Sequence, residues 1–81
     1  MQVEILLFAG SAQLAGRRAI TVEVDAPATL ADLTAALEAA APQLSHLLPV
    51  SRWAVDQQFM PLSTSISAEQ EIALIPPVSG G

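Results

Sequence analysis

The chain of 81 residues carries eight acidic residues against three arginines, a net charge of −5, and contains no cysteine. Its length allows one small domain and excludes a second, and its acidic surface repels nucleic acid and favours a partner with a basic pocket. Without cysteine it has no disulfide, no thiolate nucleophile and no metal site built on sulfur, which suits a cytoplasmic protein.

Residues 3–8 form the first expected strand. Its side chains alternate between an apolar face and a face that Glu4 marks as wet, with Val3, Ile5 and Leu7 on the first face and Glu4, Leu6 and Phe8 on the second. The segment lacks the basic start of a signal peptide, and no stretch approaches the roughly 20 apolar residues of a membrane span. We therefore expect a cytoplasmic protein that does not enter a membrane.

Residues 10–16 follow as a connection with one helical turn, and residues 19–25 form the second expected strand. In this strand Ile20, Val22 and Val24 alternate with polar residues, which is typical of a half-buried strand.

The main helix is expected to begin after Thr29. This residue is well placed as an N-cap, and Asp32 complements the exposed amides of the first helical turn. An apolar stripe at helical spacing follows, and Pro42 sets the end of the helix. The stripe consists of Leu30, Leu33, Leu37 and Ala40 or Ala41.

The remaining elements are two strands and a leucine-rich connection. Leu44, Leu47 and Leu48 are expected to close the core, and residues 52–56 and 72–75 to form the third main strand and the last strand. The order strand, strand, helix, strand, short strand or loop, strand is that of a β-grasp. This α+β fold wraps a mixed sheet across one main helix.

One helix covers only one face of such a sheet. The alternation places Leu6, Phe8 and Ile75 on the other face, and Phe59 is a candidate to join them. Scattered apolar residues are normal on protein surfaces, but a contiguous patch indicates a docking surface.

The chain ends in an unusual segment. Pro76 and Pro77 cannot donate to a sheet ladder and favour an extended backbone, so the last strand stops there and the chain is directed away from the body. Residues 78–81 reach roughly 13–14 Å when extended. Gly80 and Gly81 make that tail slim enough for a narrow channel. We expect a β-grasp domain over residues 1–77 and a flexible tail over residues 78–81.

With these features the chain resembles the small, sulfur-carrying subunit of molybdopterin synthase, within the ubiquitin-like sulfur carriers. The terminal segment is the specific mark, and weaker marks extend from end to end. They are Phe8-Ala9, Leu14-Ala15-Gly16, Thr29, Leu33, Ala54-Val55-Asp56-Gln57, Glu71-Ile72-Ala73 and Pro76-Pro77-Val78-Ser79-Gly80-Gly81. Asp56 departs from the family, which often has asparagine there, and this change affects a turn or a hydrogen bond.

The resemblance implies a carrier that is not catalytic alone. An activating enzyme would use ATP to adenylate the Gly81 carboxylate, and a sulfur donor would displace AMP to leave a thiocarboxylate. Gly80 would let the tail thread into the large subunit, in a heterotetramer, where the sulfur attacks the cyclic pterin precursor. No cofactor would be bound. Partner contacts are expected at Phe8, Phe59, Ile75, Pro76, Pro77, Val78 and Ser79.

No other residues predict chemistry of their own. His46 is expected to be a structural or surface residue, Glu69 and Glu71 solvated charges, and Ser79 has no base nearby in sequence. Gly10 and Gly16 lack the spacing of a phosphate-binding loop. We therefore expect no metal site.

Three alternatives remain open from the sequence. The chain is a sulfur carrier for thiazole, cysteine or tRNA thiolation, or a ubiquitin-like modifier conjugated to target proteins through Gly81, or a plain β-grasp interaction module with a frayed end. A modifier differs from a carrier in its product, because it forms covalent protein adducts.

Overall fold

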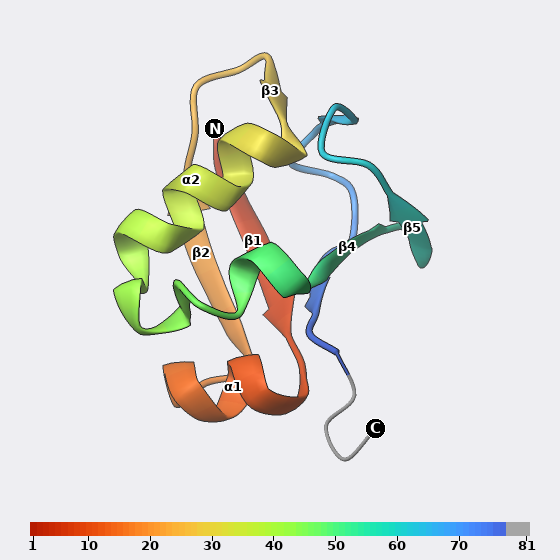
Figure 1. Cartoon of the computed structure of the whole chain (residues 1–81). Helices are drawn as coiled ribbons and strands as arrows, with labels where there is room; N and C mark the ends of the chain where they lie inside the picture. The colour runs from red at the N-terminus through yellow and green to blue at the C-terminus, as the bar shows by residue number, and fades with distance from the viewer. Residues whose placement is uncertain (78–81) are drawn as a thin grey trace.

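The computed structural model describes residues 1–77 and has the expected α+β architecture (Figure 1). In chain order the elements are β1 (Gln2–Leu7), α1 (Ala9–Ala15), β2 (Ala19–Glu23), β3 (Ala28–Thr29), α2 (Leu30–Ala40), the 3-10 turns η1 (Pro42–Leu44) and η2 (Leu48–Val50), β4 (Arg52–Val55), β5 (Gln58–Met60), β6 (Ser65–Ile66) and β7 (Ile72–Ile75).

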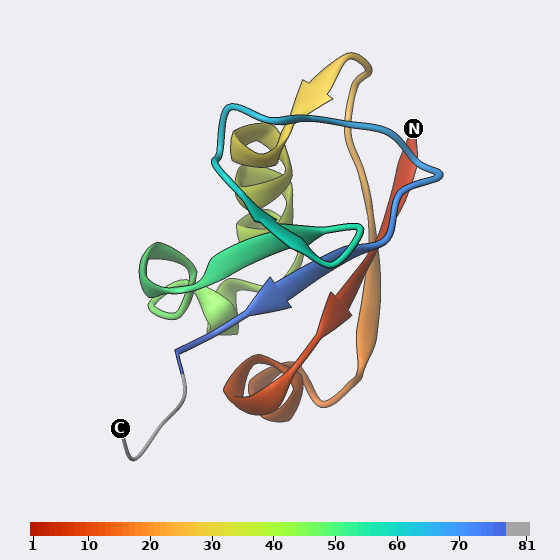
Figure 2. The same ribbon diagram turned by 90° about the vertical axis from the view of Figure 1, so that its right-hand side faces the viewer.

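The main sheet has five strands in the order β2-β1-β7-β4-β5 (Figure 2). Strand β7 pairs in parallel with β1, through Ile5 opposite Ile72, and the other pairs are antiparallel. A parallel pair needs a crossover between its strands, and here the crossover carries α2. The mixed sheet with its C-terminal strand in the centre confirms the predicted β-grasp.

Helix α2 packs on one face of this sheet, and the core lies between them. The predicted alternation in β1 is confirmed, because Val3, Ile5 and Leu7 are buried on the helix side. The predicted stripe of α2 is buried opposite them, with Leu30, Leu33 and Leu37 fully inaccessible to solvent. We call the sheet face that α2 does not cover the open face.

The start of α2 is tied to a distant part of the chain. Thr29 Oγ1 accepts a hydrogen bond from the Asp32 amide at 3.3 Å, and Asp32 Oδ2 accepts one from the Thr29 amide at 2.9 Å, which confirms the predicted cap. The amides of Leu30 and Ala31 donate to the carbonyls of Thr64 and Leu62. Strand β6 follows and pairs with β3 in a separate two-stranded sheet.

The structure differs from the sequence-based expectation in several connections. The segment after β1 is a full helix, α1, and not a single turn. It ends at Gly16, whose φ of 72° only glycine adopts readily and whose amide donates to the carbonyl of Ala12.

The third strand also ends earlier than predicted, at Val55. Asp56 and Gln57 have φ values of 50° and 69° and form a two-residue turn into β5. Asp56 Oδ1 accepts a hydrogen bond from the Glu71 amide at 3.0 Å, which connects this turn to the start of β7.

The cap of α2 yields a stability prediction. Thr29→Ala should lower the free energy of unfolding by about 1 kcal/mol, because the amide of Asp32 loses its acceptor, while Thr29→Ser should stay close to the wild type. Urea unfolding at unchanged m-value measures the difference. An identical midpoint for Thr29→Ala would mean that the carbonyls of Leu62 and Thr64 hold the helix start by themselves.

Candidate functional site

The candidate site begins where β7 leaves the sheet. Ile75, the last residue of β7, lies opposite Arg52 and faces the open side of the sheet. Pro76 is buried and Pro77 is exposed, so the predicted partner residue Pro76 rests against the body of the domain. The other predicted tail residues, Val78, Ser79, Gly80 and Gly81, lie outside the described residues. We call the end of the sheet at Ile75 the tail end.

An apolar patch covers the open face beside the tail end. Direct cross-strand neighbours share a sheet face, and the register runs from Phe59 through Ala54 and Ala73 to Leu6. Phe8, one step beyond β1, is 47% exposed, and Phe59 is 51% exposed. The structure therefore places the predicted residues Phe8, Phe59 and Ile75 on the open face. We call the set Leu6, Phe8, Ala54, Phe59, Ala73 and Ile75 the apolar patch.

Phe8 separates two shallow hollows in this surface. One hollow, of about 250 Å³, brings Phe8 together with Ile75, Ala54 and Glu71. The other, of about 430 Å³, lies between Phe8 and Arg18 at the start of α1. Phe8 therefore lines both hollows and is accessible to a partner from either one.

A buried serine holds Phe8 in place. The Ser11 hydroxyl donates to the Phe8 carbonyl at 2.7 Å and accepts from the Phe8 amide at 3.2 Å. Ser11 is the one fully buried polar side chain among residues 1–77, and both bonds join it to the backbone of Phe8. Sequence reasoning missed this residue, because the helix that buries it was expected to be a single turn.

The side chain of Arg52 packs over the ring of Phe59. The guanidinium carbon of Arg52 lies 3.8 Å from the centre of the Phe59 ring, which is close enough for a cation–π interaction. Since Arg52 pairs with Ile75, this contact joins the tail end to the outer strand β5. Phe59 thus keeps a defined orientation on the surface although half of its area is exposed to water.

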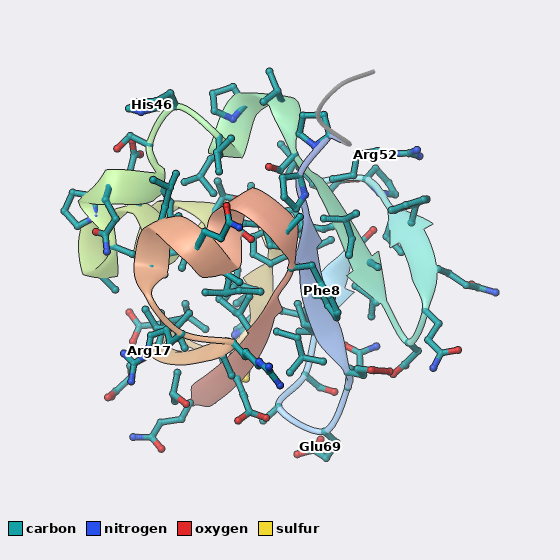
Figure 3. The ribbon with its side chains drawn as sticks, turned by 90° about the horizontal axis from the view of Figure 1, so that it is seen from below. Phe8, Arg17, His46, Arg52 and Glu69 are labelled. Carbon is teal, nitrogen blue, oxygen red and sulfur yellow. The ribbon has the colours of Figure 1, made fainter. Side chains whose placement is uncertain are left out.

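The titratable residues singled out from the sequence lie on the surface. His46 is exposed between η1 and η2, and in Figure 3 it lies away from Phe8 and Arg52, as expected for a surface residue. Glu69 and Glu71 are exposed, as predicted for solvated charges. Within residues 1–77 no group of three or more histidine, cysteine or acidic side chains is arranged to hold a metal ion. No helix in this range is long and apolar enough to span a bilayer.

What the site offers is a shape and a surface. A central strand ends at one edge of an exposed apolar patch, and Pro76 and Pro77 follow it there. An exposed apolar patch of this kind is suited to contact with a protein partner.

Comparisons with known proteins agree with this geometry. The sequence model of the ThiS family matches residues 5–81. The molybdopterin synthase sulfur carrier subunit of Dictyostelium discoideum is 37% identical over 83 aligned positions, which cover 99% of this chain and 96% of the relative.

Solved structures give the same picture. The crystal structure of small archaeal modifier protein 1 from Haloferax volcanii is 35% identical with a TM-score of 0.88, and the match covers 100% of both chains. A complex of subunits 1 and 2 of the molybdopterin-converting factor from Helicobacter pylori contains a chain that is 26% identical with a TM-score of 0.71, again over 100% of both chains. Because the family model and these relatives extend over nearly the whole sequence, the chain belongs to the ThiS family.

Proposed function

We propose that this chain is the sulfur carrier subunit of a molybdopterin synthase. The observation that carries the proposal is the position of β7, which ends beside the exposed patch of Phe8 and Ile75 and is followed in the sequence by two prolines and the Gly-Gly terminus. The relative from Dictyostelium discoideum, named for this role, supports it over the full length.

The chemistry begins at the Gly81 carboxylate. A carboxylate is a poor electrophile, so an activating enzyme first joins it to the α-phosphate of ATP and releases pyrophosphate. A sulfur donor then attacks the acyl carbon and displaces AMP, which leaves a thiocarboxylate. This chain contributes the reacting carboxylate and a tail slim enough to enter both active sites.

The thiocarboxylate is a soft nucleophile that serves the second step. In the large subunit its sulfur attacks a carbon of the cyclic pterin precursor, and a carbon–sulfur bond forms as a carbon–oxygen bond at that carbon breaks and the oxygen leaves. Water then cleaves the acyl–sulfur bond, which returns Gly81 to a carboxylate and leaves the sulfur on the precursor. We assign the acid–base groups for this step to the large subunit. The complex of two subunits from Helicobacter pylori supports a large-subunit partner, and we propose a heterotetramer.

The apolar patch is the proposed docking surface for both partners. Phe8 and Phe59 expose about half of their area in the free chain, so covering the rest of each is worth about half of the roughly 1.5–3 kcal/mol of full burial. The activating enzyme and the large subunit would then compete for one surface. Competition is useful for a carrier, because the product must leave the first enzyme before it reaches the second.

A protein modifier is the second candidate, and one observation favours it. The small archaeal modifier protein 1 of Haloferax volcanii matches this chain with 35% identity over its whole length. A modifier would share the activation step but end as an isopeptide on target lysines. A carrier for thiazole, cysteine or tRNA thiolation would share the thiocarboxylate and differ only in its acceptor.

Intact mass spectrometry of the protein from its native cell tests the proposal. One oxygen-for-sulfur exchange localised to Gly81 is expected, together with capture of the large subunit from the same cells. Covalent adducts through Gly81 without any thiocarboxylate would establish the modifier instead. A thiocarboxylate without a large-subunit complex would point to another thiolation pathway.

The first functional prediction concerns the terminal residue. Deleting Gly81, or adding one residue after it, should abolish sulfur transfer, because the reacting carboxylate is displaced from both active sites. The thermal unfolding midpoint should hardly change, since chain ends add few buried contacts. Sulfur transfer at the wild-type rate by the deletion variant would refute the role of Gly81.

The second concerns the width of the tail. Gly80→Val should prevent transfer, because a β-branched side chain widens the tail and forbids positive φ. Ala39→Val, which adds the same side chain at an exposed position of α2, is the matched control and should transfer sulfur normally. Single-turnover transfer with purified partners measures both, and normal adenylation and transfer by Gly80→Val would show that no narrow channel is involved.

The third concerns the apolar patch. Phe8→Asp should weaken binding of the large subunit at least tenfold, at about 1.4 kcal/mol per decade, because a buried ring is replaced by a charge. Folding stability should be kept, since aspartate is a favourable N-cap at the start of α1.

Two variants serve as controls for Phe8→Asp. Leu14→Asp changes a residue that is 48% exposed on α1, away from the sheet, and should leave affinity unchanged. Leu7→Asp changes a residue that is 3% exposed and should unfold the domain. Calorimetric titration and thermal melts decide the outcome. Unchanged affinity for Phe8→Asp would remove the patch from the interface.

A further inference from the structure

Charge is distributed unevenly along the open face. The strand register places Ile5 opposite Ile72, so Glu71 lies beside Glu4 where β7 begins. Glu71 also lines the hollow that Phe8 and Ile75 share. Glu69 completes this group, since Glu4, Glu69 and Glu71 line one hollow of about 320 Å³. All three carboxylates are exposed. We call these three residues the acidic end of the open face.

The opposite end of the same face is basic. Arg52 lies opposite Ile75, and Arg18 lines the hollow at the start of α1 together with Leu6 and Phe8. Both arginines are exposed. In Figure 3, Arg52 and Glu69 lie at opposite ends of the β7 ribbon, with Phe8 between them. The apolar patch therefore lies between an acidic end and a basic tail end.

The arrangement of charges at the two ends of the apolar patch affects how a partner docks. Apolar burial is not directional, so the patch alone does not determine which way round a partner lies on the sheet. Charges at the two ends of the patch determine the orientation of the partner, because charges of the same sign on the two proteins repel and charges of opposite sign attract. A tail that must enter a channel needs one orientation of the partner. The reversed orientation would bury the same patch and point the tail away from the channel.

We propose that the protein that covers the open face is basic opposite Glu4, Glu69 and Glu71, and that this pairing sets the orientation in which the tail meets its channel. The inference rests on the proposed function, because it concerns the partners of the same surface. The inference adds the surface chemistry expected of the partner. The partner has an apolar centre and, on the side away from its channel, an adjoining area rich in lysine or arginine.

Association kinetics test the proposal with a matched control. Glu4→Lys and Glu69→Lys each change the net charge as much as Glu38→Lys does, but Glu38 is exposed on α2, on the covered side of the sheet. With the large subunit at about 0.01 M salt, the first two should slow association about threefold or more relative to Glu38→Lys. At about 1 M salt, where the Debye length is about 3 Å, the difference should vanish.

Cross-linking tests the orientation directly. The chain has neither cysteine nor lysine, so a thiol-to-amine linker attaches only where a cysteine is introduced and then reaches amines of the partner. The one backbone amine, at Met1, donates to the carbonyl of Val24 at 2.7 Å. Ala68→Cys, beside the acidic end, should give adducts with lysines of the large subunit. Ala35→Cys, exposed on α2, should give few or none.

The outcomes separate the two proposals. Binding and sulfur transfer by the wild type, with equal association rates for Glu4→Lys and Glu38→Lys, would overturn the charge pairing and leave the proposed function standing. Equal cross-linking from positions 68 and 35 would overturn it as well. A wild-type chain that does not bind the large subunit would overturn both. Thermal melts of every variant show that a change in rate is not a change in folding.

Discussion

The parallel pairing of β7 with β1 is the constraint on which the other features depend. It places the last strand in the middle of the sheet, between β1 and β4, so the N-terminal and C-terminal halves of the chain share one ladder. It also fixes the direction of β7, which must end at the same edge as β1. As a result β7 ends at Ile75 beside Phe8, and the last strand and the exposed patch meet in one hollow.

The same architecture explains why large apolar side chains remain exposed. A domain of 81 residues has one main helix, which buries one face of the sheet and leaves the other without cover. Phe8 and Phe59 are therefore exposed to solvent, yet both are held in place. The buried Ser11 hydroxyl bonds to the backbone of Phe8, and the Arg52 guanidinium packs over the Phe59 ring. Holding a contact residue before binding reduces the ordering cost of association.

Periodic segments of the sequence predicted the fold well, and turn geometry accounts for what they missed. Alternation in β1 and the leucine stripe of α2 identified the core, because burial imposes its period on the residues. Strand β5 and the turn at Asp56 carry no such period, since β5 is exposed at the sheet edge. The sequence likewise did not predict the role of Ser11 in holding the backbone of Phe8. That role comes from hydrogen bonds to the backbone that any serine near a helix start could form.

The edge of the sheet at β5 offers little to an added strand. Strand β5 is only three residues long, begins at a tight turn and is followed by Pro61, which has no N–H to offer to an added strand. Short edge strands and edge prolines are common protection against strand addition. On this side of the sheet a partner gains more by covering the open face, where it meets the apolar patch between charges of opposite sign. A carrier that visits two enzymes in turn benefits from this arrangement, because side-chain contacts on a face form and release without the rearrangement of backbone ladders.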